Sequence, residues 1–172
     1  MNAKDLFGER ATYEFIDWLD SIGYFDCPAS ISHHGNVNGG LFSHCLLVAN
    51  QLNNLTKKLN LKWDMPDSPY IVGLLHDICK CDDYVLNNDL KWEYNKNKKM
   101  DGHGDKSILM LSGHFDLTPQ ESKCIQFHMG SFTDKEQWKY YCNAIKEEPN
   151  VLYTHMADMI ASQILEDKAD LL

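Results

Sequence analysis

The chain has 172 residues, a length typical of one domain, and we expect a single domain spanning residues 1–172. Its composition, 44% hydrophobic and 24% charged residues, is ordinary for a soluble globular protein. The net charge of −9 argues against non-specific nucleic-acid binding, because proteins that bind nucleic acid without regard to sequence present a basic surface.

The cellular compartment is predicted from signal-peptide, membrane-span and cysteine patterns. Residues 1–6 include no apolar run of the kind found in a signal peptide, and no stretch approaches the roughly 18 apolar residues of a membrane span. The six cysteines form no Cys-x-x-Cys pair and are expected to be reduced thiols. A zinc site on Cys79 and Cys81 is disfavoured, because a spacing of one residue suits tetrahedral zinc poorly. We therefore expect a cytoplasmic protein without a membrane partner.

Apolar residues recur at spacings of three and four along much of the chain, which predicts an all-α fold. The first predicted helix ends at Gly23 and carries one apolar face: Tyr13, Ile16, Leu19 and Ile22. The next predicted helix has a longer face that includes a histidine: Leu41, His44, Val48, Leu52, Leu55 and Leu59. Ser68 followed by Pro69 predicts the start of a third helix, which we expect to run to about Lys80.

The second half of the chain has its own helix-start signals. Capping-box patterns at Thr118 and at Thr133 each predict a helix, the second of which should run through Ile145. Pro149 opens a last predicted helix that carries Val151, His155, Asp158, Ser162 and Leu165. Two long polar segments, 23–40 and 82–104, are expected to be functional loops, and the second is compatible with a short β-hairpin.

The residue pair His76-Asp77 follows an apolar run and carries the clearest chemical signal. Burying an imidazole and a carboxylate without partners is costly. A divalent metal would remove that cost, since it binds neutral imidazole and ionised carboxylate. His44 and Asp158 also lie on apolar helix faces. From the residues alone, the alternatives are a surface His-Asp pair, a satisfied core histidine and a paired buried aspartate.

The order of these residues, with His44 first, His76-Asp77 second and Asp158 last, resembles the HD superfamily of metal-dependent phosphohydrolases. Segment 39–44 is similar to the first-ligand segment of that family, and segment 75–80 is similar to its namesake pair. The resemblance extends from about residue 33 to residue 165. It implies an all-α HD-domain helical bundle in which metals are held among helix faces.

Two further histidines fit an extended version of this pattern. The segment around His103 resembles a helix-start segment of many HD proteins, and His128 ends a helix where other members carry histidines. The resemblance implies two divalent ions, bridged by Asp77, drawn from Fe, Mn, Zn, Ni, Co or Mg. Their charge would let an acidic protein bind a phosphate ester. The implied ligands are His44, His76, Asp77, His103, His128 and Asp158. The alternative for His103 is a loop histidine, and for His128 a histidine stabilised by a helix C-terminus.

The same resemblance suggests catalytic and substrate-binding residues. Lys80 stands where HD enzymes commonly carry a lysine, and Asp77 and Lys80 are the expected catalytic residues. His33 and His34 resemble a segment that precedes the first ligand in the HD domains of certain exoribonucleases. The candidate substrate-binding residues are His33, His34, Lys80 and Lys106, and for each the alternative is a solvated side chain. His155 lies one turn before Asp158 and is a candidate to support the ligands.

The implied reaction is hydrolysis of a phosphomonoester or phosphodiester in a small, nucleotide-like substrate by metal-activated water. The sequence has neither the Gly-Tyr-Pro signature nor the paired second histidine of the HD-GYP phosphodiesterases, and is more similar to small bacterial HD-domain proteins. Two alternatives stay open. One is a mixed-valent di-iron oxygenase resembling inositol oxygenase, which uses the same six ligands. The other is a non-catalytic HD module that binds a nucleotide.

Overall fold

The structure is a computed structural model that describes residues 6–31 and 37–165, so the candidate residues His33 and His34 lie outside the described part. The described chain is mostly helical, which confirms the predicted all-α class. Its α-helices are α2 (Tyr13–Ser21), α3 (Gly40–Leu59), α4 (Ser68–Leu75), α5 (Lys80–Asp83), α6 (Gly104–Leu111), α7 (Pro119–Gln126), α8 (Trp138–Glu147) and α9 (Asn150–Ile160). Shorter elements are the 3₁₀ turns η1 (Gly130–Phe132) and η2 (Lys135–Gln137), the π-helical turn η3 (Ala161–Leu165), and the strands β1 (Tyr84–Leu86) and β2 (Trp92–Tyr94).

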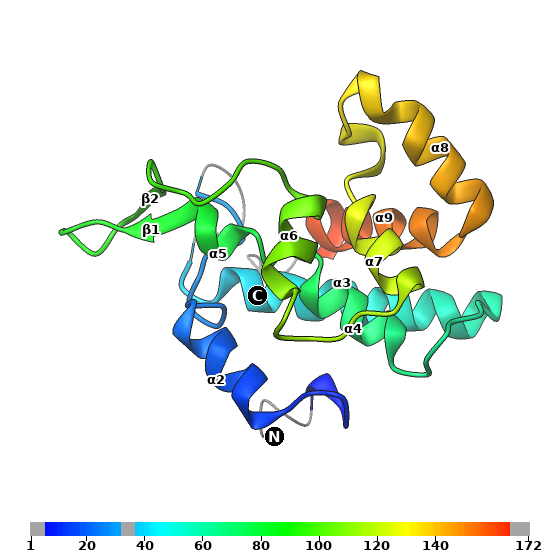
Figure 1. Cartoon of the computed structure of the whole chain (residues 1–172), viewed down its shortest axis with the longest axis horizontal. Helices are drawn as coiled ribbons and strands as arrows, with labels where there is room; N and C mark the ends of the chain where they lie inside the picture. Colours follow the sequence, from blue (N-terminus) through cyan, green and yellow to red (C-terminus); the bar gives the residue numbers. More distant parts are fainter. Residues whose placement is uncertain (1–5, 32–36, 166–172) are drawn as a thin grey trace.

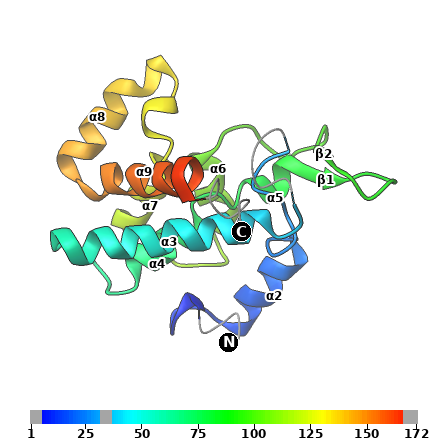
Figure 2. The same ribbon diagram turned by 180° about the vertical axis from the view of Figure 1, so that it is seen from behind.

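Helix α3 is the centre of the bundle, and α4 and α9 both pack along it (Figure 1). Helix α7 contacts both α4 and α9, and α6 packs on α7. The view from behind shows the same arrangement, with α8 and the β-hairpin projecting at opposite ends of the molecule (Figure 2). Within the described ranges, no helix has the length and apolar character that crossing a bilayer requires.

The hairpin in segment 82–104 confirms the short β-structure that the sequence allowed. Strands β1 and β2 pair antiparallel, with Tyr84 opposite Tyr94 and Leu86 opposite Trp92. The Trp92 indole donates a hydrogen bond to Asn38 Oδ1 over 2.8 Å. This bond joins the hairpin to the loop that precedes α3.

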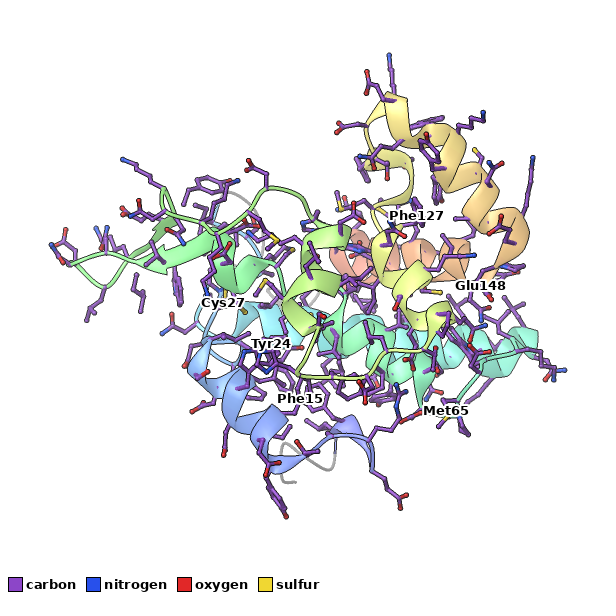
Figure 3. The ribbon with its side chains drawn as sticks, in the orientation of Figure 1. Phe15, Tyr24, Cys27, Met65, Phe127 and Glu148 are labelled. Carbon is purple, nitrogen blue, oxygen red and sulfur yellow. The ribbon has the colours of Figure 1, made fainter. Side chains whose placement is uncertain are left out.

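Helix α2 packs on the bundle through aromatic side chains. Phe15 is buried, with its ring centroid 5.7 Å from that of Phe7 and 4.9 Å from that of Phe115. Figure 3 shows Phe15 and Tyr24 among the side chains between α2 and the central helices. The predicted face of this helix was wrong at Tyr13, which is 64% exposed, because the buried face runs through Phe15 and Leu19 at a spacing of four.

Of the two capping boxes predicted from the sequence, the structure contains one. The capping box at Thr118 is confirmed: its hydroxyl accepts from the Glu121 amide, and the Glu121 carboxylate accepts from the Thr118 amide. The second predicted box is wrong, because Asp134 caps only the short turn η2 and makes no side-chain capping bond. Helix α8 begins later, at Trp138.

The predicted third helix is too long, because α4 ends at Leu75 instead of continuing to Lys80. Beyond it the backbone bonds change from four-residue to three-residue spacing, with Ile78 donating to Leu75 and Lys80 donating to Asp77. The Cys79 amide donates to the Ser107 hydroxyl on α6 over 3.3 Å. A tertiary partner therefore holds the backbone just after the His-Asp pair.

Glu121 is buried, yet its carboxylate is fully supplied with donors. Arg10 donates to both of its oxygens, at 2.6 and 2.9 Å, and the Ser68 hydroxyl donates at 2.7 Å. These bonds connect the segment before α2 to the starts of α4 and α7. The network therefore holds in place the two helices whose C-terminal ends lead into the site.

Candidate metal centre

A first group of side chains converges from three parts of the fold. His44 comes from α3, His76 and Asp77 follow α4, and Asp158 comes from α9. His44 Nε2 lies 3.3 Å from His76 Nε2 and 3.3 Å from Asp158 Oδ1. Asp77 Oδ2 lies 3.6 Å from His76 Nε2 and 3.8 Å from His44 Nε2. The four candidates that the sequence spreads over more than a hundred residues meet at one point.

A second group uses the other carboxylate oxygen of Asp77. His103 Nε2 lies 2.7 Å from Asp77 Oδ1, and His128 Nε2 lies 3.2 Å from the same oxygen. The rings of His103 and His128 are neighbours, with centroids 4.9 Å apart. Asp77 thus stands between two groups of imidazoles, one facing each of its oxygens.

Two glycines allow the close helix contacts on which this convergence depends. A Cβ atom on Gly73 would collide with the backbone of Ala49, so α4 can approach α3 only with glycine there. A Cβ atom on Gly104 would collide with the carbonyl of Gln126, at the end of α7. The first contact brings the end of α4 to α3, and the second brings His103 to the end of α7.

Hydrogen bonds to the backbone orient two of the imidazoles. His76 Nδ1 lies 2.8 Å from the Gly73 carbonyl, and His128 Nδ1 lies 2.7 Å from the Ile125 carbonyl. Because a carbonyl only accepts, each Nδ1 must donate, which leaves the Nε2 lone pair of the neutral ring directed at Asp77. This is the tautomer that a metal bound at Nε2 requires.

The charges of the cluster suit a cation. Burial lowers the pKa of His76 to about 4, so this ring is neutral at pH 7. Burial acts to raise the pKa of Asp77, but the Lys80 ammonium and the imidazoles of His76 and His103 outweigh it and hold that pKa well below its usual range. For Asp158, burial is likewise outweighed by the nearby histidines, and its pKa falls to about 2. The set therefore presents ionised carboxylates beside neutral imidazole.

One buried atom decides whether these residues fit a metal. Asp77 Oδ1 is buried, no described residue meets it with full hydrogen-bond geometry, and two imidazole nitrogens lie within 3.2 Å of it. Burying a carboxylate oxygen without a partner destabilises the folded state by roughly several kcal/mol unless a nearby cation offsets this cost. The buried His/Asp cluster is therefore consistent with divalent metal binding.

A comparison with protein families agrees with this geometry. The model of the HD domain matches residues 41–167, which is most of the chain. The chain belongs to the HD superfamily of metal-dependent phosphohydrolases. Neither the curated proteins nor the solved structures contain a match to it.

The His/Asp cluster of this HD domain opens into a cavity of about 500 Å³. Five predicted site residues line it: His44, Asp77, Lys80, His103 and Asp158. The sequence pointed to the rest of the wall only through the predicted functional loop 23–40, which holds Ala29 and Ser30, and through Ser162, one turn after Asp158 on the predicted last helix. The additional lining residues are Ala29, Ser30, Met129, Phe132, Met159, Ser162 and Gln163.

Lys80 lies at the boundary between the cluster and the cavity. Its ammonium is 2.6 Å from Asp77 Oδ2. Burial alone would lower the pKa of Lys80, but the adjacent carboxylate of Asp77 raises it above its usual value. The HD domain therefore keeps a positive charge between the His/Asp cluster and the cavity.

Lys106 does not take the position that was predicted for it. Its side chain is buried, and its ammonium lies 2.7 Å from Asp82 Oδ2 and 2.7 Å from Asp83 Oδ1. It is not part of the cavity wall. The reason is that α5 turns its carboxylates toward α6, so Lys106 joins these helices and is not available to bind a substrate.

Two other side chains contact the candidate ligands at atoms that do not face Asp77. Cys79 Sγ lies 3.2 Å from His103 Nδ1, and His155 Nδ1 donates to the His128 carbonyl over 2.9 Å. His155 therefore contacts the segment that carries a candidate ligand, as a supporting residue would. The Cys79 thiol contacts the side of the His103 ring that faces away from Asp77.

Proposed function

We propose that this HD domain is a phosphohydrolase that cleaves a phosphomonoester or phosphodiester of a small, nucleotide-like substrate with metal-activated water. The observation that carries the proposal is the buried Asp77 carboxylate between two sets of imidazole nitrogens. One functional unit over residues 1–172 is part of the proposal, since residues outside the matched segment also line the cavity.

The two faces of Asp77 suggest how two ions would be held. We assign one ion to His44, His76, Asp77 and Asp158. We assign the other to His103, His128 and Asp77, which would bridge the pair. Divalent ions so held lower the pKa of bound water and neutralise phosphoryl oxygens. Imidazole and carboxylate ligands together suit Fe, Mn, Zn, Ni or Co, and Mg to a lesser degree.

The protein residues would then contribute position and charge. Lys80 would donate a hydrogen bond to a phosphoryl oxygen or to the leaving oxygen, because it reaches both the cavity and Asp77. Asp77 would hold both ions and so position the attacking water, since its carboxylate stays ionised at neutral pH; the proton of that water would pass to solvent in the cavity. His44, His76, Asp77 and His128 are buried, and burial strengthens the electrostatic interactions that they make.

Metal analysis and a hydrolysis screen test the proposal. Protein purified without added metal is analysed for bound ions, and is then assayed for phosphate release and phosphodiester cleavage across a nucleotide panel. We expect metal-dependent turnover that is lost in His76→Ala and retained in the control His114→Ala. The control removes a histidine whose ring stacks on Trp18, outside the cluster.

Two outcomes would contradict the proposal. Bound iron with oxygen uptake, and no hydrolysis of any phosphoester, would favour the di-iron oxygenase. Tight nucleotide binding without turnover in any of several metals would favour a non-catalytic module.

A further inference from the structure

A second cavity lies beside the metal cavity and shares three lining residues with it: His103, Met129 and Phe132. Its volume is about 220 Å³. The rest of its wall consists mainly of polar residues and glycines: Gly102, Gly104, Asp105, Gln126, Thr133, Asp134 and Gln137. A molecule that reaches the metals could therefore extend over Phe132 into this second space.

Phe132 is a large apolar side chain that lines the cavity next to the buried His/Asp cluster and yet is mostly exposed. It is 65% exposed, and its ring stands nearly edge-on to that of His155, with centroids 6.3 Å apart. It ends the turn η1, which begins two residues after His128. An exposed ring at the boundary of two cavities is a surface on which a flat ring of a substrate can stack.

The charge of the second cavity limits what can enter it. Of the described residues that form its wall, none is lysine or arginine, whereas Asp105 and Asp134 are carboxylates. Gln126 already donates to Asp105 over 2.7 Å, while Asp134 is exposed and makes no side-chain cap to η2. The metal cavity adds a single lysine, Lys80. This wall would repel a second phosphate and accept hydrogen bonds from N–H or O–H groups.

We propose that the second cavity is the subsite for the organic part of the substrate, a flat ring that stacks on Phe132 and donates hydrogen bonds to Asp134. The substrate then carries one phosphoryl group, which lies at the metals. This inference rests on the proposed function and adds the position and chemical class of the leaving group.

Paired substrates test the stacking. Adenosine 5′-monophosphate carries a flat ring, and glycerol 2-phosphate has none. We expect Phe132→Ala to lower the ratio of kcat/KM for the two substrates about tenfold. Tyr140→Ala, which removes another exposed aromatic ring, should leave the ratio as it is.

Charge reversal tests the polar part. We expect Asp134→Lys to raise the relative kcat/KM for adenosine 3′,5′-bisphosphate over adenosine 5′-monophosphate about tenfold. The control Glu136→Lys adds the same charge two residues away, at an exposed position outside the cavity wall, and should change this ratio less than twofold.

The failures of the two proposals can be told apart. If the unaltered protein hydrolyses no member of the nucleotide panel, the proposed function fails, and titration of the metal-loaded protein with adenosine 5′-monophosphate still tests whether Phe132→Ala weakens binding. If hydrolysis occurs but Phe132→Ala leaves the ratio intact, or Met159→Ala, which changes the metal cavity but not the second cavity, lowers it instead, the subsite is refuted. A wild-type preference for the bisphosphate would refute it as well.

Discussion

The pKa of His76 predicts a specific loss of stability in mild acid. Burial lowers this pKa from 6.5 to about 4, so between these values the unfolded chain binds a proton that the native protein does not. Stability therefore rises with pH across this window, and falls as the pH drops from 6.5 toward 4. The perturbation to test is His76→Gln, which removes the titrating ring.

The magnitude follows from the two pKa values. Between pH 7 and pH 5, the unfolded imidazole takes up most of a proton, whereas the native ring takes up only about a tenth of one. Linkage converts this difference into about 2 kcal/mol of stability lost by the wild-type protein because of His76 alone. For a chain of this size, 2 kcal/mol corresponds to roughly 4–8 °C in Tm.

Urea unfolding with a chelator present, at pH 7 and at pH 5, measures this effect. The stability difference between the two pH values should be about 2 kcal/mol smaller in His76→Gln than in the wild type. Glutamine also changes packing, but that cost is present at both pH values and cancels. An equal pH dependence in the two proteins would refute the view that His76 is held neutral in the metal-free fold.

Three further predictions concern the metals, the lysine and the fold. After a chelator has removed any metal and has itself been removed, adding back a divalent metal that binds, at 100 times its Kd, should stabilise the protein by about 2.7 kcal/mol in thermal unfolding. Asp77→Asn should lose most of this gain. Lys80→Met should lower kcat/KM by about 10²–10³-fold while elemental analysis shows unchanged metal content, because one charged donor to the phosphoryl group is lost. Glu121→Ala should cost about 1.5–3 kcal/mol in urea unfolding, since Ser68 and Arg10 lose their hydrogen bonds to a buried carboxylate while Arg10 keeps the Asp116 carbonyl and Asp67; the exposed control Glu136→Ala should change stability by about 0.5 kcal/mol or less.

The parts of the fold that sequence could predict are those that local interactions determine. The α7 start is correct because Thr118 and Glu121 bond to each other's backbone within one turn. The end of α4 was missed because no glycine or proline marks it. There the Cys79 amide bonds to Ser107, a partner 28 residues away. Such a tertiary hydrogen bond leaves no periodic signal.

The same distinction separates the site residues. His44 and Asp158 could be found because a polar group on an apolar helix face stands out in one sequence. Lys106 was misplaced because its partners, Asp82 and Asp83, lie in a segment that periodicity could describe only as a loop. Phe132 was missed because its role depends on two cavities that exist only after α7 and α9 have packed.

The position of the two key histidines just beyond helix ends explains how the fold prepares a metal site. His76 follows the last residue of α4, and His128 lies two residues after the end of α7. Each ring donates from Nδ1 to the carbonyl three residues earlier, Gly73 or Ile125. A helix C-terminus leaves its last carbonyls without regular intrahelical donors, so each ring supplies a donor there, in addition to the His128 amide in the case of Ile125. The same bond turns the Nε2 lone pair toward Asp77. One local arrangement, used twice, therefore directs two electron pairs at one buried carboxylate, and this arrangement is consistent with a divalent cation held between them.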